Sequence, residues 1–430
     1  MASPTSGSPS EPGPDHDPDA GQPGWSTTLY AVWFGEILAL VGFSSRVPFL
    51  PFFLGDLGVT DVAGQTLWSG AINATGAAAL AITAPLWGVL ADRYGRKPML
   101  LRGLFGGALC VALMGFATAP WQLLALRVLE GSMTGTVAAA AALVATSAPR
   151  HRMGYALGMV QTAVFAGAAG GPLLGGYLYD WAGPRVAFWV AGGMLFAGGV
   201  VVALFAREQF TRTARAPLRE NEGRWQRLRA SSAFMVSAAM LTLFAAIFVV
   251  RMTAMAMQPI MPLFVEQLAP NTADVATMAG IVLGAAGFTS ALAAAYFGRL
   301  GDRIGHRRVL GVSLALSGAL YLPMALVTNA WQLAALQGLL GVAAGGLIPS
   351  ANALITHLTP HDKRGAIFGL TAGLSGLGGF AGPLLGAIVA TSFGFRATFV
   401  ASGILMLAIS ILVIWSLAAD RAQPPLAGAG

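Results

Sequence analysis

Charged side chains are scarce in this chain. They make up 10% of its 430 residues, whereas an average soluble domain contains about 25%. Hydrophobic residues make up 56%, and this excess argues against a soluble globular fold. A membrane-spanning helix needs roughly 20 apolar residues. Read at that length, the sequence predicts about twelve spans.

Cysteine and histidine are also nearly absent from these apolar stretches. The single cysteine, Cys110, excludes an internal disulfide, and all five histidines lie outside the predicted spans. His357 and His361 are four residues apart but have no neighbouring cysteine or third ligand, so we expect no metal site. No phosphate-binding loop pattern appears, which argues against ATP-driven transport. We therefore expect no cofactor and no enzyme activity.

The predicted spans are helices, because lipid offers no partner for backbone N–H and C=O groups. Their approximate ranges are 26–54, 65–92, 98–118, 121–147, 153–179, 185–206, 232–264, 276–298, 308–328, 331–356, 365–390 and 397–418. Residues 1–24 are rich in proline, glycine and serine and lack the basic and apolar regions of a signal peptide. We expect them to form a disordered tail.

Lysine and arginine are concentrated on one side of the predicted membrane protein. With an N-terminus inside the cell, 20 basic residues fall on the inner side and only Arg185 and Arg396 on the outer side. This bias follows the positive-inside rule and predicts that both termini are cytoplasmic. It also accounts for the net charge of +7 without a nucleic-acid partner.

The sequence repeats itself at an offset of about 210 residues. GVLADRYGRKPML (88–100) matches GRLGDRIGHRRVL (298–310), and WQLLALRVLEG (121–131) matches WQLAALQGLLG (331–341). Six spans in each half give both halves the same orientation, which makes this a parallel repeat. The predicted units are a tail (1–24), a first half (25–206), a basic linker (207–231), a second half (232–418) and a C-terminal tail (419–430).

Several motifs resemble those of the major facilitator superfamily, and in particular its twelve-span drug:proton antiporter branch. GVLADRYGRK resembles the superfamily signature between spans two and three, GFSSRVPFLP (42–51) a first-span pattern, and LRVLEG (126–131) a fourth-span motif. GAAGGPLLGG (167–176) resembles the fifth-span antiporter motif. The resemblance implies an all-α membrane protein with twelve helices in two pseudo-symmetric halves, located in a bacterial inner membrane.

The loop motif gives each half one aspartate on the predicted cytoplasmic side. Because a helix N-terminus carries about half a positive charge, Asp92 is expected to contact the start of span eleven when that side closes. Asp302 is expected to contact the start of span five. The matching positions are Gly88, Asp92, Arg93, Gly95, Arg96 and Lys97 in the first copy and Gly298, Asp302, Arg303 and Gly305 in the second. A plain basic loop is the alternative.

The antiporter motif places small residues and a proline inside span five. Its members are Gly167, Gly171, Pro172, Gly175 and Gly176. Glycines let helices approach closely, and proline removes a backbone hydrogen bond. The motif predicts either a tight seam that prevents leak or ordinary helix packing, and spacing alone does not separate the two.

Three charged residues fall near the middle of the predicted membrane. Glu36 lies about 15 Å into span one, and Arg127 and Glu130 lie roughly 9 and 14 Å along span four. Charges at this depth are costly and usually functional. We expect Arg127 to pair with Glu130 or Glu36, and one of the two carboxylates to exchange protons. A static ion pair between the spans is the alternative.

Other polar residues are expected to line a substrate cavity. They are Arg251, Gln161, Gln258, Gln337 and Asn352. Arg46, near the outer end of span one, is expected to extend its head toward water. The resemblance implies export of drug-like molecules in exchange for protons by a monomeric protein. A proton-coupled importer of a metabolite or sugar on the same fold is the alternative.

Overall fold

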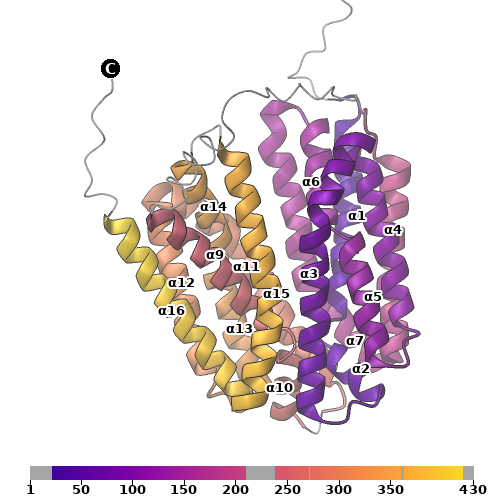
Figure 1. The fold of residues 1–430 in the computed structure, drawn as a ribbon, viewed down its shortest axis with the longest axis vertical. Coiled ribbons are helices and arrows are strands. Elements are labelled where there is room, and N and C mark those ends of the chain that lie inside the picture. The colour runs from indigo at the N-terminus through magenta and orange to yellow at the C-terminus, as the bar shows by residue number, and fades with distance from the viewer. Residues whose placement is uncertain (1–21, 210–237, 271, 360–362, 420–430) are drawn as a thin grey trace, which may run out of the picture.

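The computed structural model describes residues 22–209, 238–270, 272–359 and 363–419. Most of the predicted N-terminal tail, nearly all of the basic linker and almost the whole C-terminal tail therefore lie outside the described residues. Within them the secondary structure is helical, without strands. Figure 1 shows two groups of helices side by side, the first running from indigo to magenta and the second from red to yellow.

The helices of the first group come from the N-terminal half. They are α1 (Trp25–Ser45), α2 (Leu50–Asp56), α3 (Val62–Tyr94), α4 (Arg96–Met114), α5 (Pro120–Met133), α6 (Thr136–Ser147) and α7 (Met153–Phe205), with the short 3-10 helix η1 (Arg150–Arg152) before α7. Helix α7 contains non-helical backbone at Gly183 (φ 82°) and so consists of two helical parts. This glycine adopts a left-handed conformation that other residues rarely take.

The second group repeats the pattern of the first. It comprises α9 (Ala238–Ala256), α10 (Met261–Leu268), α11 (Val275–Ile304), α12 (His306–Met324), α13 (Ala330–Ala344), α14 (Leu347–Leu358), α15 (Arg364–Phe393) and α16 (Phe395–Ala419). Ten helical segments of the described chain are long and apolar enough to cross a membrane, and α7 with the preceding η1 counts as one of them. Because α7 consists of two helical parts, it accounts for two crossings, and α12 adds one more. The described helices therefore make twelve crossings.

Four of the predicted spans are divided into two helices. Span one breaks between α1 and α2, span four between α5 and α6, span seven between α9 and α10, and span ten between α13 and α14. Proline stands in the first turn of both α2 and α10, where its missing N–H costs no helical hydrogen bond. Gly135 between α5 and α6 has a φ of 109°. The prediction of continuous helices is therefore wrong at these four places.

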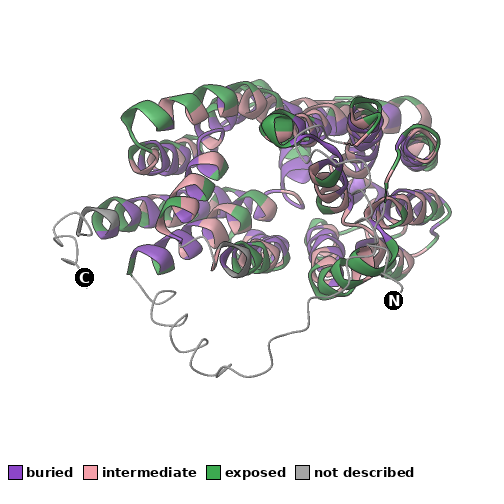
Figure 2. Cartoon of the chain, turned by 90° about the horizontal axis from the view of Figure 1, so that it is seen from above, coloured by how far each residue is buried: buried purple, intermediate pink, exposed green. Residues whose placement is uncertain are grey.

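Each half has its own apolar core. Leu100, Leu104 and Leu195 belong to one buried cluster of the first half, and Phe264 and Phe399 to the cluster of the second half. Seen along the helices, exposed residues lie mainly around the outside of the two bundles (Figure 2). Many are large and apolar, such as Trp181 and Trp415, each 71% exposed. In water this surface would be costly, whereas lipid accommodates it.

The two ends of the molecule differ in which segments they carry. We call the end with α2, α10 and the Gly183 bend the α2/α10 end, and the end with Asp92 and Asp302 the basic end. Helix α7 packs against α11, and α3 packs against α15, across the boundary between the halves. Figure 1 shows α3 and α15 adjacent toward the α2/α10 end.

Candidate functional site

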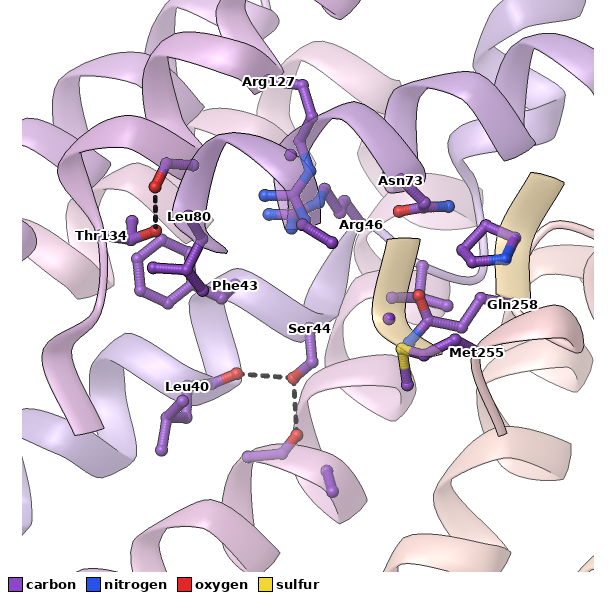
Figure 3. A pocket seen from close by; sticks show the side chains of 18 of the residues that line it. Leu40, Phe43, Ser44, Arg46, Asn73, Leu80, Arg127, Thr134, Met255 and Gln258 are labelled. Carbon is purple, nitrogen blue, oxygen red and sulfur yellow. Dashed lines mark hydrogen bonds between the residues drawn. The ribbon is translucent and has the colours of Figure 1, made fainter. Parts of the chain in front are cut away.

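A cavity of about 330 Å³ lies between the two halves. Its wall comes from α1, α3, α5 and α7 of the first half and from α9 and α15 of the second. Arg46, Arg127, Arg251, Asn73 and Gln258 supply its longer polar side chains. Figure 3 shows Arg46 and Arg127 close together, with Asn73, Met255 and Gln258 around the same space. The cavity is therefore shared between the two halves.

Glu130 joins two of these arginines. Its Oε1 lies 3.1 Å from Nη1 of Arg46, and its Oε2 lies 2.7 Å from Nη1 of Arg127. The Glu130 side chain is 1% exposed. Arg127 and Glu130 occupy positions three apart on α5, so they share one helix face. We call these three residues the ion triad.

The expectation that Arg46 extends toward water is wrong. Helix α1 ends at Ser45, and the turn that follows directs Arg46 inward, where it is 6% exposed. In one continuous helix over residues 26–54, Arg46 would lie near the membrane surface, but the chain turns between α1 and α2. The P-x-x-P pattern at 48–51 was the available signal, because proline favours a new helix start.

Glu36 is the second buried carboxylate, and its surroundings are different. It is fully buried on α1, and the Thr136 hydroxyl donates a hydrogen bond to its Oε2 at 3.2 Å. Its Oε1 has no hydrogen-bond partner, and none of the described residues forms an ion pair with it. Glu36 does not line the cavity, but Leu40 one turn farther along α1 does, as does Thr134 beside the α5–α6 break.

The predicted cavity residues divide into three groups. Arg251 and Gln258 line the cavity, and Arg251 has no ion pair with any described residue. Gln161 and Asn352 are exposed residues outside the cavity lining. Gln337 is buried, with its Nε2 3.9 Å from Sδ of Met261. The described lining thus carries three guanidinium groups, and Glu130 is the carboxylate paired with two of them.

The antiporter motif packs against two different helices. Gly167, Gly171 and Gly175 lie against α1, where an added Cβ would meet Leu40, Ser44 and Ser45 respectively. Gly176 instead lies against the backbone of Ala276 in α11, across the boundary between the halves. The carbonyl of Pro172 lies against Gly280 of the same helix. Both interpretations of the motif thus remain predictions, with Gly176 and Pro172 at the boundary.

The loop motif forms a tight turn in both halves. Gly95 (φ 100°) and Gly305 (φ 94°) adopt backbone conformations that favour glycine. Gly88 and Gly298 lie in open surroundings. Asp92, Arg93, Asp302 and Arg303 are exposed. Asp302 Oδ1 lies 3.2 Å from Nε2 of His306, which stands where the first copy of the motif has Arg96.

Arg96 and Lys97 have a partner that the sequence did not suggest. Glu208 accepts hydrogen bonds from their backbone N–H groups at 2.7 and 2.8 Å, and so caps the N-terminus of α4. Lys97 Nζ donates to the carbonyls of Ala203 and Ala206 at the end of α7. These basic residues therefore join helix ends within the first half.

Comparisons with known proteins agree with this architecture. The model of the Major Facilitator Superfamily matches residues 32–277 and 243–429. The chain is 38% identical over 375 residues to "Multidrug resistance protein MdtG" of Proteus mirabilis, covering 87% of this chain and 92% of that protein. It is 36% identical over 393 residues to the protein of that name from Serratia proteamaculans, covering 91% and 94%.

Two solved structures share the fold. A bacterial homologue of the human lysosomal transporter Spinster, in an inward-facing and occupied conformation, aligns with a TM-score of 0.76 and 14% identity over 94% of this chain and 99% of that one. The human organic anion transporter MFSD10 aligns with a TM-score of 0.68 and 21% identity over 91% and 100%.

Proposed function

Because this chain belongs to the major facilitator superfamily, we propose that it exports drug-like molecules from a bacterial cell in exchange for protons. The names of its multidrug resistance relatives, similar over most of their length, support the export of drugs. The cavity between the halves supports alternating access. The basic end is then the cytoplasmic one, in line with the distribution of lysine and arginine.

Glu36 carries the proposal for proton coupling. Burying a charge is costly unless it is paired, and Glu36 is fully buried without a described cation. Protonation removes that cost, so this carboxylate can bind a proton in one access state and release it when the other state admits water. Glu130 is already paired with two arginines. We assign Glu130 to holding Arg46 and Arg127 in the cavity wall.

Glu36 is connected to the cavity through two elements. Leu40 and Phe43 on α1 line the cavity beyond Glu36, and Thr134 lies two residues before Thr136. A substrate that displaces α1 or the α5–α6 break changes the surroundings of the carboxylate. Binding of substrate and binding of a proton are then linked by a coupling free energy.

The charged residues of the cavity indicate which charge a substrate can carry. Arg46, Arg127 and Arg251 line it, and Glu130 compensates only in part. A lone cation would be repelled by this wall, so we propose uncharged or acidic substrates. For an uncharged substrate, one proton moving down 100 mV supplies about 2.3 kcal/mol. This supports a concentration ratio of roughly fiftyfold.

Proton movement in inverted membrane vesicles tests the proposal. The vesicles are acidified inside by respiration, and a panel of uncharged and acidic drugs is added while a dye reports the internal pH. We expect at least one drug to dissipate the gradient in wild-type vesicles and not in Glu36→Gln vesicles. If no drug does so while intact cells take up a labelled metabolite, the importer on the same fold is the correct function.

A further inference from the structure

Helices α3 and α11 occupy equivalent places in the two halves, but their N-termini are capped differently. Asp61 precedes α3, and its Oδ2 accepts a hydrogen bond from the Gly64 N–H at 2.6 Å. Asp274 occupies the same place before α11 but makes no side-chain hydrogen bond to the helix. The first N–H groups of a helix have no partner within the helix, so α11 needs a cap from elsewhere.

The cap of α11 comes from the other half of the molecule. Asp180, in the first part of α7, accepts a hydrogen bond from the Thr277 N–H at 2.6 Å through Oδ2. Its Oδ1 lies 3.4 Å from the Ala276 nitrogen. A carboxylate at a helix N-terminus is favoured both by the unpaired N–H groups and by the helix dipole. We call this contact the Asp180 cap.

The Asp180 cap stands at the end of a close seam between the halves. Gly176, one turn before Asp180, lies against the backbone of Ala276, and Gly280 lies against the carbonyl of Pro172. These glycines bring the backbones of α7 and α11 into contact, which larger residues would prevent. The two helices cannot separate at the α2/α10 end without breaking the Asp180 cap.

At the basic end, no hydrogen bond or ion pair links Asp92 or Asp302 to the other half among the described residues. Asp92 is exposed, and the side chain of Asp302 is 75% exposed. Among the described residues, the Asp180 cap therefore joins the two halves at the α2/α10 end. Two positions, Asp180 and Asp274, are available to cap the same helix, and only one of them does so here.

We infer that Asp180 and Asp274 exchange as the cap of α11 during transport, Asp180 when the α2/α10 end is closed and Asp274 when it is open. The inference rests on the alternating access of the proposed function. With Asp180 withdrawn, Asp274 takes the role that Asp61 has at α3. Through this exchange, the first N–H groups of α11 have a hydrogen-bond acceptor in both states. Asp180 stabilises the state in which the α2/α10 end is closed, and Asp274 stabilises the state in which it is open.

Distance measurements between nitroxide labels test this inference in the full-length protein. The labels are placed at Thr60→Cys and Trp331→Cys, on opposite halves near the α2/α10 end, with Cys110→Ser removing the native thiol. An N-cap contributes about 1 kcal/mol, which corresponds to a roughly fivefold change in the ratio of two states. We expect Asp180→Ala to raise the long-distance fraction by about that factor, and Asp274→Ala to lower it.

Two further variants serve as controls. Asp61→Ala removes a cap that lies within one half, so we expect it to lower stability without shifting the distances. Asp180→Asn keeps an acceptor oxygen without the charge, and we expect an intermediate shift. It also provides a result if Asp180→Ala does not fold.

The inference is overturned if Asp180→Ala and Asp180→Asn leave the distance distribution as in wild type. It is also overturned if Asp274→Ala shifts the distances in the same direction as Asp180→Ala. The readout needs neither a drug nor a proton gradient. Failure of the vesicle experiment with intact distance shifts would therefore contradict the proton-coupled export alone.

Discussion

Glu36 and Glu130 are both buried carboxylates, yet their neighbours give them different roles. Glu130 has guanidinium groups at 3.1 and 2.7 Å, whereas Glu36 has a single threonine hydroxyl. Removing one partner of a buried ion pair typically costs 3–5 kcal/mol, because the remaining charge is left uncompensated. Removing an unpaired carboxylate carries no such penalty.

This difference predicts the effect of matched substitutions on stability. Glu130→Gln leaves Arg46 and Arg127 without their carboxylate, so we expect the free energy of unfolding to fall by about 3 kcal/mol. Glu36→Gln keeps the shape and removes no cation's partner, and we expect a change below about 1 kcal/mol. Thermal unfolding of the two purified variants in detergent measures both. Equal losses of stability would contradict the assignment of separate roles.

The sequence was sufficient to predict where these charges lie in the chain, but not which of them meet. The three-residue spacing of Arg127 and Glu130 indicated one helix face, and the structure pairs them. The contact between Arg46 and Glu130 joins residues 84 positions apart, and it depends on the turn after α1. Asp180 and Glu208 were not predicted for the same reason, since each caps a helix that is distant in sequence.

At the scale of helices, apolar length predicted the crossings well and their interruptions poorly. The long α3, α11 and α15 match predicted spans because lipid requires continuous backbone pairing. The breaks after α1, α5, α9 and α13 interrupt the helical hydrogen bonds, and at the α5–α6 break the Thr134 carbonyl accepts a hydrogen bond from Arg102 instead. There, other groups satisfy the backbone, and hydropathy does not report them.

The seam between α7 and α11 gives a prediction at this scale. An added Cβ at Gly176 meets the backbone of Ala276, which cannot move without separating the helices. We expect Gly176→Ala to increase the passive decay of a pH gradient in vesicles severalfold, because the seal between the halves is disturbed. Gly193→Ala is the matched control, since Gly193 also lies in α7 but has open space around it. Identical decay in both variants would contradict a sealing role for the seam.

At the scale of the whole molecule, the two halves share one architecture but not one set of charges. The ion triad and Glu36 belong to the first half, and Gln337 replaces Arg127 in the second. The second half contributes Arg251 and Gln258 to the shared cavity. Proton binding is thus proposed for one half, while the substrate contacts both. The repeat made this division visible in the sequence, whereas the shared cavity required the structure.

The central claim is that Glu36 couples proton movement to transport without binding the substrate itself. It is tested most directly in proteoliposomes, by comparing substrate exchange at equal pH with accumulation driven by a pH gradient. We expect Glu36→Gln to keep exchange within about twofold of wild type and to lose accumulation, while Asp61→Asn keeps both. Accumulation by Glu36→Gln at the wild-type level, or loss of exchange together with accumulation, would contradict the account.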